Sequence, residues 1–102
     1  MHTLMVTYRP PVDPVAFRDH YRNKHLPLAA ALPGLRAARY SLDVHHEQSG
    51  SSIFALFEGD FESEETMRAA LSSPEGAAAQ ADLQNFATGG VDIFDFVRSE
   101  LP

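Results

Sequence analysis

Four residues at helical spacing place a histidine on an apolar face. Phe17, Tyr21, His25 and Leu28 follow one another at intervals of four, four and three, so one side of a helix would carry all of them. The ordinary pKa of an imidazole is about 6.5, and burial beside aromatic rings lowers it. His25 could therefore accept and return a proton near neutral pH, with Tyr21 holding the ring or a substrate.

A proline two residues later gives this histidine a second, purely structural role. Pro27 has no N–H to donate to the carbonyl of Asn23, so we expect a kink or a fresh start of helix at Leu26. His25 could donate a hydrogen bond to the freed carbonyl, and the spacing alone leaves both roles open. We expect the break to expose His25 to a cavity between helix and sheet.

A tyrosine on a predicted strand is the next candidate for catalysis. Residues 35–46 alternate, with Ala38, Tyr40, Leu42 and Val44 on one face. A phenol that is buried at one end usually finds a hydrogen-bond partner, although core packing would also account for Tyr40. The apolar residues that we expect to bind a substrate are Phe17, Leu28, Phe57 and Phe86.

The remaining polar residues predict no metal site. His45 and His46 are adjacent, so on a strand they would face apart and could not chelate one metal. The chain has no cysteine, which excludes a thiolate nucleophile, a disulfide and a cysteine-ligated zinc. We expect His20 to be exposed, and Asp82 and Asn85 to cap or tie the last helix.

The order of elements predicts an α+β fold in one domain over residues 1–102. Strands are expected over residues 3–8, 35–46, 52–61 and 91–97, and helices after the N-caps Asp13, Ser63 and Ser73. This strand–helix–strand–strand–helix–strand order favours an antiparallel sheet with its helices on one face. Both faces of the sheet read as apolar, so a second copy of the chain is the simplest cover for the open face.

Charge and hydropathy exclude several classes of protein. The net charge of −6 argues against a nucleic-acid surface, which needs a basic patch. No apolar run approaches the roughly 20 residues that span a membrane. The N-terminus has no basic stretch followed by an apolar segment, so it does not read as a signal peptide, and we expect a cytoplasmic protein.

The segment around His25 resembles the signature of the EthD family, small bacterial proteins named for ethyl tert-butyl ether degradation. The matching residues in "AFRDHYRNKHLPLAAALPGL" are Phe17, Tyr21, His25, Pro27, Pro33 and Gly34. The later segments "FEGDFESEETMRAAL", "SSPEG" and "ADLQNF" are also similar to the family's second half.

The resemblance implies a ferredoxin-like subunit that pairs sheet to sheet as a dimeric α+β barrel. It also implies chemistry without a cofactor on a small, largely apolar aromatic or oxygenated molecule, of an oxidoreductase, monooxygenase, isomerase or cyclase type. His25 would move the proton while Tyr21 and Tyr40 orient the substrate. The alternatives are a non-catalytic accessory protein of an oxidative pathway and a haem protein with His25 as axial ligand.

Overall fold

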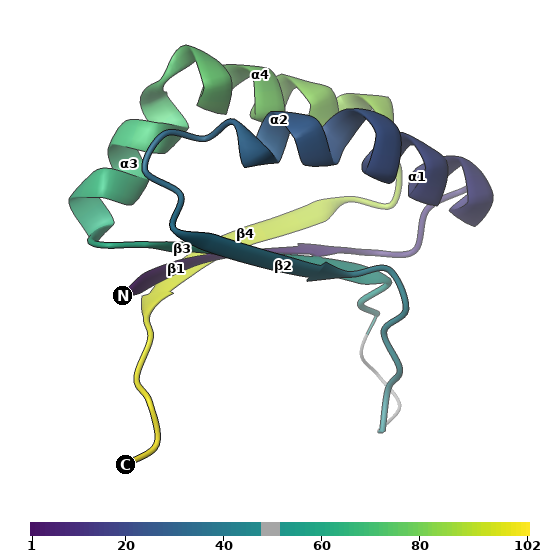
Figure 1. The fold of residues 1–102 in the computed structure, drawn as a ribbon. Coiled ribbons are helices and arrows are strands. Elements are labelled where there is room, and N and C mark those ends of the chain that lie inside the picture. Colours follow the sequence, from purple (N-terminus) through teal and green to yellow (C-terminus); the bar gives the residue numbers. More distant parts are fainter. Residues whose placement is uncertain (48–51) are drawn as a thin grey trace.

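Four antiparallel strands form one sheet, and the helices lie over one of its faces (Figure 1). This computed structural model describes residues 1–47 and 52–102. The sequence "EQSGSS" at 47–52 predicts a hairpin loop, most of which lies outside the described residues. In spatial order the strands are β2 (Ala37–Ser41), β3 (Ala55–Phe61), β1 (His2–Tyr8) and β4 (Val91–Val97).

The helices over this face come in two groups, called here the first and the second helical layer, which lie side by side on the sheet (Figure 1). The first consists of α1 (Pro14–His20), the π-helical turn η1 (Tyr21–His25) and α2 (Leu26–Ala30). The second consists of α3 (Glu64–Ser72), α4 (Pro74–Asp82) and the 3-10 turn η2 (Leu83–Asn85). The resulting βαββαβ order confirms the predicted α+β, ferredoxin-like fold. No helix in the described part of the chain is both long and apolar enough to cross a membrane.

The helices begin where their capping residues predict. Asp13 accepts a hydrogen bond from the Ala16 N–H at 3.1 Å, and Pro14 is the first helical residue. Ser63 and Ser73 cap α3 and α4 in the same way. Each cap satisfies an N–H that has no partner within its helix, which is why the predicted starts are confirmed.

β2 is shorter than its alternating sequence predicts. The strand ends at Ser41, because the Ser41 hydroxyl accepts the N–H of Asp43 at 3.1 Å and the chain turns out of the ladder. The placement of His45 and His46 on a strand is therefore wrong. Both lie in an exposed segment beyond its end.

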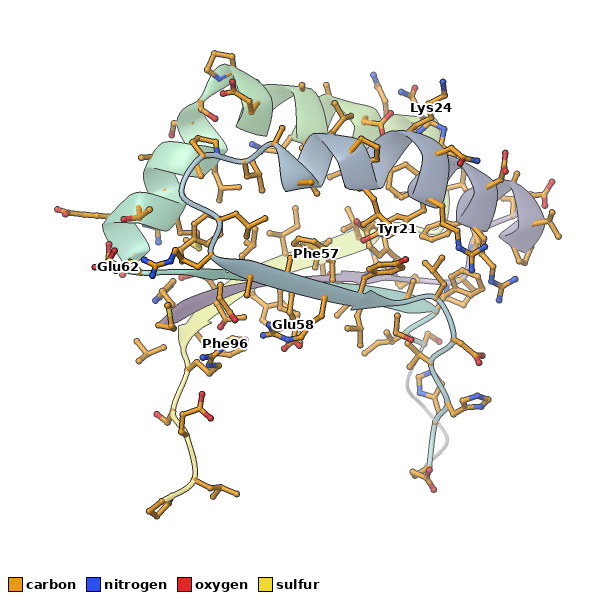
Figure 2. All side chains as sticks on the ribbon, viewed as in Figure 1. Tyr21, Lys24, Phe57, Glu58, Glu62 and Phe96 are labelled. Atoms are coloured by element: carbon orange, nitrogen blue, oxygen red, sulfur yellow. The ribbon has the colours of Figure 1, made fainter. Side chains whose placement is uncertain are left out.

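The register of the strands separates the two faces of the sheet. Val6 pairs with Phe57 on β3 and with Ile93 on β4, so these residues share the face under the helices. Figure 2 shows Phe57 on the helix side of the sheet and Glu58 and Phe96 on the opposite side. Apolar side chains on this open face are Met5, Leu56, Phe94 and Phe96, with Phe94 46% exposed.

A carboxylate surrounded by hydrogen-bond donors occupies part of the open face. Asp60 is buried and accepts hydrogen bonds from Arg39 at 2.9 and 3.1 Å, from the Thr3 hydroxyl at 2.8 Å and from Arg98. These bonds, Arg39 first, hold the pKa of Asp60 well below its usual range. The open face therefore has its charges paired and its aromatic rings exposed.

The turn that ends the first helical layer requires a glycine. Gly34 follows Pro33 and has φ +80°, and a Cβ placed on it would lie 2.6 Å from Cγ2 of Thr66 on α3. Gly34→Ala should lower the free energy of unfolding by about 1–3 kcal/mol, because an L side chain is strained at this φ and also collides with Thr66. Urea unfolding followed by circular dichroism measures the loss.

The double variant Gly34→Ala/Thr66→Ser separates the two causes. Serine lacks the colliding methyl group, so the pair should recover the steric part of the loss and keep the backbone part. Wild-type stability in the single Gly34→Ala variant would contradict this account of the turn.

Candidate functional site

A π-helical turn places Tyr21 and His25 together in the interior. The N–H of Leu26 donates to the carbonyl of Tyr21, five residues earlier, so this turn is wider than an α-helical one. Pro27 follows at once in the first turn of α2, where its missing N–H is tolerated. The backbone stays helical through His25 and Leu26, so the helix passes Pro27 by a π-helical turn and not by a fresh start. Tyr21 is completely buried and His25 is only 6% exposed.

The carboxylate of Asp82 accepts hydrogen bonds from three side chains. Its Oδ2 lies 2.9 Å from Nδ1 of His25, and both of its oxygens lie 3.0 Å from Nε2 of His20. The side-chain amide of Asn85 donates to Oδ1 at 2.9 Å. The cluster therefore joins the first helical layer to the end of α4.

Hydrogen bonding keeps this carboxylate ionised. Burial acts to raise the pKa of Asp82, but the hydrogen bonds from Asn85, His25 and His20 outweigh it and hold the pKa below its usual value. An ionised carboxylate only accepts hydrogen bonds, so Nδ1 of His25 carries the hydrogen. In the neutral ring the lone pair is then on Nε2, which has no hydrogen-bond partner among residues 1–47 and 52–102.

Burial makes His25 a base at neutral pH. Loss of hydration lowers the pKa of His25 below 6.5, while the hydrogen bond and negative charge of Asp82 act in the opposite direction. The imidazole is held between aromatic rings, with ring centroids 4.7 Å from Phe86 and 5.4 Å from Tyr21. The histidine is therefore neutral, oriented and able to accept a proton at Nε2.

His25 lies in the wall of a small apolar cavity. The cavity has a volume of about 50 Å³ and lies between β1, α2 and α4. Its wall is almost entirely apolar, and the side chains that bring polar atoms to it are His25, Tyr8 and Gln80. The volume is roughly a third of that of a benzene-binding cavity, so it suits a reacting group of a few heavy atoms.

Two buried phenols accompany the histidine. Tyr8 contributes to the cavity wall, and burial raises its pKa well above the usual value. Burial, and then the neighbouring Tyr8 and Tyr40, likewise raise the pKa of Tyr21. The Tyr21 hydroxyl is buried without a hydrogen-bond partner in the described residues. Figure 2 shows Tyr21 between the first helical layer and the sheet.

The structure places the predicted substrate-binding residues apart. Phe57 lines the cavity beside His25. Phe17 and Phe86 line a different hollow, of about 100 Å³, although the Phe86 ring also packs on His25. Leu28 is half-buried and lines neither space.

Tyr40 lies outside the cavity of His25. It is 46% exposed because β2 is an edge strand, and its ring centroid is 5.8 Å from that of Tyr21. Tyr21 lies against both rings, that of Tyr40 and that of His25. The phenol that shares the cavity wall with His25 is Tyr8, which the sequence marks only as one residue of an alternating strand.

Sequence reasoning also missed the pairing of Asp82. The expectation that His20 is exposed is wrong, because it is partly buried, bonded to Asp82 and stacked on Phe86 at 5.2 Å. His25 bonds the Asp82 side chain rather than a carbonyl freed by Pro27. The only local signal was the spacing of Asp82 and Asn85, three residues apart. This spacing does not identify His25, 57 positions away, as a partner of Asp82.

The side chains around the site do not suit a metal ion, and the cavity is too small for a porphyrin. In the ranges 1–47 and 52–102, no three His, Cys, Asp or Glu side chains are arranged to hold a metal ion. A cavity of about 50 Å³ is far below the roughly 300 Å³ at which sites for drug-sized ligands begin, so it does not admit a haem.

These features define a small ferredoxin-like α+β protein with a buried histidine–aspartate pair. The chain belongs to the EthD family, because the EthD domain model matches residues 9–90. It is 39% identical over 95 residues to the "uncharacterized 11.0 kDa protein in thcB-thcC intergenic region" of Rhodococcus erythropolis, covering 91% of this chain and 90% of that protein.

Solved structures share the same fold. An EthD family protein from Bacillus halodurans superimposes with a TM-score of 0.89 at 28% identity, over 97% of this chain and 99% of that one. A dimeric ferredoxin-like protein of unknown function from Thermobifida fusca gives a TM-score of 0.70 at 16% identity, over 95% and 89% of the two chains.

The lowered pKa of His25 predicts a loss of stability in mild acid. Below pH 6.5 the unfolded chain binds a proton at His25 before the folded protein does, so the free energy of unfolding should fall from pH 7.5 to 5.5. His25→Gln should remove most of this fall, and the exposed His45→Gln should not. Denaturant unfolding at both pH values, with an NMR titration of the His25 ring, measures it. A ring that titrates above pH 6.5 would contradict this assignment.

Proposed function

We propose that this EthD-family protein binds a small, largely apolar carbonyl compound and transfers a proton on it without a cofactor. The observation that carries the proposal is the state of His25. Its Nδ1 donates to an ionised Asp82, its Nε2 has no partner in the described chain, and the ring lies in the wall of an apolar cavity. A fixed, neutral imidazole beside an apolar space is suited to general acid–base catalysis.

The proposed reaction begins at a C–H bond next to a carbonyl group. Nε2 of His25 takes the proton, and the electron pair of the broken C–H bond moves to the carbonyl oxygen as an enolate. Asp82 stabilises the imidazolium that forms. His25 then returns the proton to another atom of the substrate. Isomerisation and cyclisation both start from this enolate, and neither needs an oxidant.

The phenols supply the hydrogen bond to the oxygen. Tyr8 lines the cavity, and its raised pKa keeps the hydroxyl protonated, so it can donate to a developing enolate. We assign to Tyr21 and Tyr40 a positioning role, since Tyr21 packs between the rings of His25 and Tyr40.

We also propose that two copies of the chain pair through the open face of the sheet. The helices cover only the opposite face (Figure 1), and the open face exposes the aromatic rings of Phe94 and Phe96. Two of the structurally similar proteins, from Thermobifida fusca and a Jannaschia species, are described as dimeric. Pairing of two such faces would remove the exposed rings from water.

Removal of the imidazole should abolish proton transfer. In D₂O, the wild-type protein should accelerate deuterium uptake next to the carbonyl of butanone, followed by ¹H NMR. His25→Gln should lose about 100-fold or more of this rate, because an amide forms hydrogen bonds but does not shuttle protons near neutral pH. Asp82→Asn should lose less, because it removes only the orienting carboxylate.

His45→Gln is the matched control, because His45 lies in the exposed segment beyond β2. It should exchange deuterium at the wild-type rate. Full activity in His25→Gln would refute the proposal. Ketone binding without any exchange in the wild-type protein would also refute it, and would assign an accessory binding role.

The paired state predicts a particle of twice the chain mass. Sedimentation at micromolar concentration should give about 22 kDa, twice the 11.2 kDa of one chain. Phe94→Lys should shift the equilibrium towards the monomer, because it places a charge in the apolar contact. Val15→Lys, at an exposed site on α1, is the control. A wild-type monomer would exclude the interface.

A further inference from the structure

The basic side chains of the protein fall into two groups. Five arginines form ion pairs with carboxylates, namely Arg9, Arg36, Arg39, Arg68 and Arg98. The other three basic residues are Arg18, Arg22 and Lys24, and none of them forms an ion pair with the described residues. All three lie in the first helical layer, and Figure 2 shows Lys24 pointing away from the sheet.

The two unpaired arginines border one groove. Arg18 and Arg22, one helical turn apart, line a space of about 420 Å³ together with Tyr40, Leu42 and Asp43. This space lies between the first helical layer and the end of β2. Two guanidinium groups and an exposed phenol therefore face the same opening.

One of these arginines is held in place. Nε of Arg18 donates to the carbonyl of Leu42 at 3.4 Å, and its guanidinium carbon lies 4.9 Å from the ring centroid of Phe54. The terminal nitrogens of Arg18 have no partner among the described residues. The donors are thus fixed in position and free to bind an anion, which lowers the entropy that a ligand must lose.

The groove and the cavity of His25 border the same second space. A second hollow of about 260 Å³, lined mainly by apolar side chains, shares Tyr40 with the groove. It shares Phe57 and Ala29 with the cavity of His25. Because β2 is an edge strand, no further strand from residues 1–47 or 52–102 covers these spaces from the side. The three spaces are therefore neighbours between the two arginines and the histidine, each sharing wall residues with the next.

We propose that this groove is a binding site for a small amphipathic monocarboxylate. Arg18 and Arg22 bind the carboxylate through charge-assisted hydrogen bonds, and the apolar body lies in the second hollow towards Phe57. Asp43 offsets one of the two positive charges, so the groove carries a net charge of +1 and suits a monoanion. The chain as a whole has a net charge of −6, so away from this groove it repels anions rather than collecting them.

The proposed carboxylate site indicates which class of substrate the proposed reaction would use. A carboxylate that also carries a carbonyl group would be anchored at the arginines and present its C–H bond towards His25. This consequence rests on the proposed proton transfer. The binding of the carboxylate at the groove does not.

The site can be tested by ¹H–¹⁵N NMR titration with hexanoate and with hexanamide, its uncharged analogue of the same length. Hexanoate should bind the wild-type protein at least fivefold more tightly than hexanamide, with shifts at residues 18–22 and 40–43. Arg22→Gln should weaken hexanoate binding at least fivefold and leave hexanamide unchanged. Asp43→Asn should tighten hexanoate binding, because it removes the opposing charge.

Lys24→Gln is the matched control, because it removes one positive charge close by on the outward side of the same layer. It should change hexanoate affinity less than twofold. Equal weakening by Lys24→Gln and Arg22→Gln would overturn the proposal, since it would mean long-range attraction only. Equal affinities for hexanoate and hexanamide would overturn it as well.

His25→Gln distinguishes this proposal from the proposed function. It should bind hexanoate with wild-type affinity while it loses deuterium exchange on ketones. Failure of exchange in the wild-type protein would refute the proton transfer and leave the groove standing. Failure of Arg22→Gln to weaken hexanoate would refute the groove and leave the proton transfer standing.

Discussion

The hydrogen bond between the Asp82 carboxylate and Nδ1 of His25 is the interaction on which the candidate site depends. It joins the end of α4 to the π-helical turn of the first layer, and His20 and Asn85 complete the set of donors around the same carboxylate. A buried carboxylate stays ionised only where such donors replace its water. Its ionisation then fixes the tautomer of His25 and leaves Nε2 as the free base.

The cavity beside that base follows from small residues where the two helical layers meet. Ala29 on α2 and Gly76 and Ala79 on α4 line it, and their small size leaves the space open. A Cβ on Gly76 would meet the backbone oxygen of Ala70, so glycine is also what allows α4 to start so close to α3. Packing of the helices and the space for a ligand therefore depend on the same residues.

Local rules predict the elements but not the partners of the site. The caps Asp13, Ser63 and Ser73, the disturbance of the helix at Pro27 and the shared face of Tyr21 and His25 each depend on residues within four positions of one another. Such patterns are visible in a single sequence.

The contact between His25 and Asp82 spans 57 positions, and the place of Tyr8 in the cavity wall depends on where both helical layers settle on the sheet. Neither has a local signature. The early end of β2 is an error of another kind, because one serine side chain overrides an alternating pattern that predicts a longer strand.

The charged groups on the two faces of the sheet have different roles. On the open face Asp60 is satisfied by Arg39, Arg98 and Thr3 within one chain, so a second copy could cover this face without leaving a buried charge unpaired. On the helix side, the Asp82 cluster leaves His25 neutral, with Nε2 free to bind a ligand. Among the described basic side chains without an ion pair, Arg18 and Arg22 are the two that border the groove, at the edge where the sheet meets solvent.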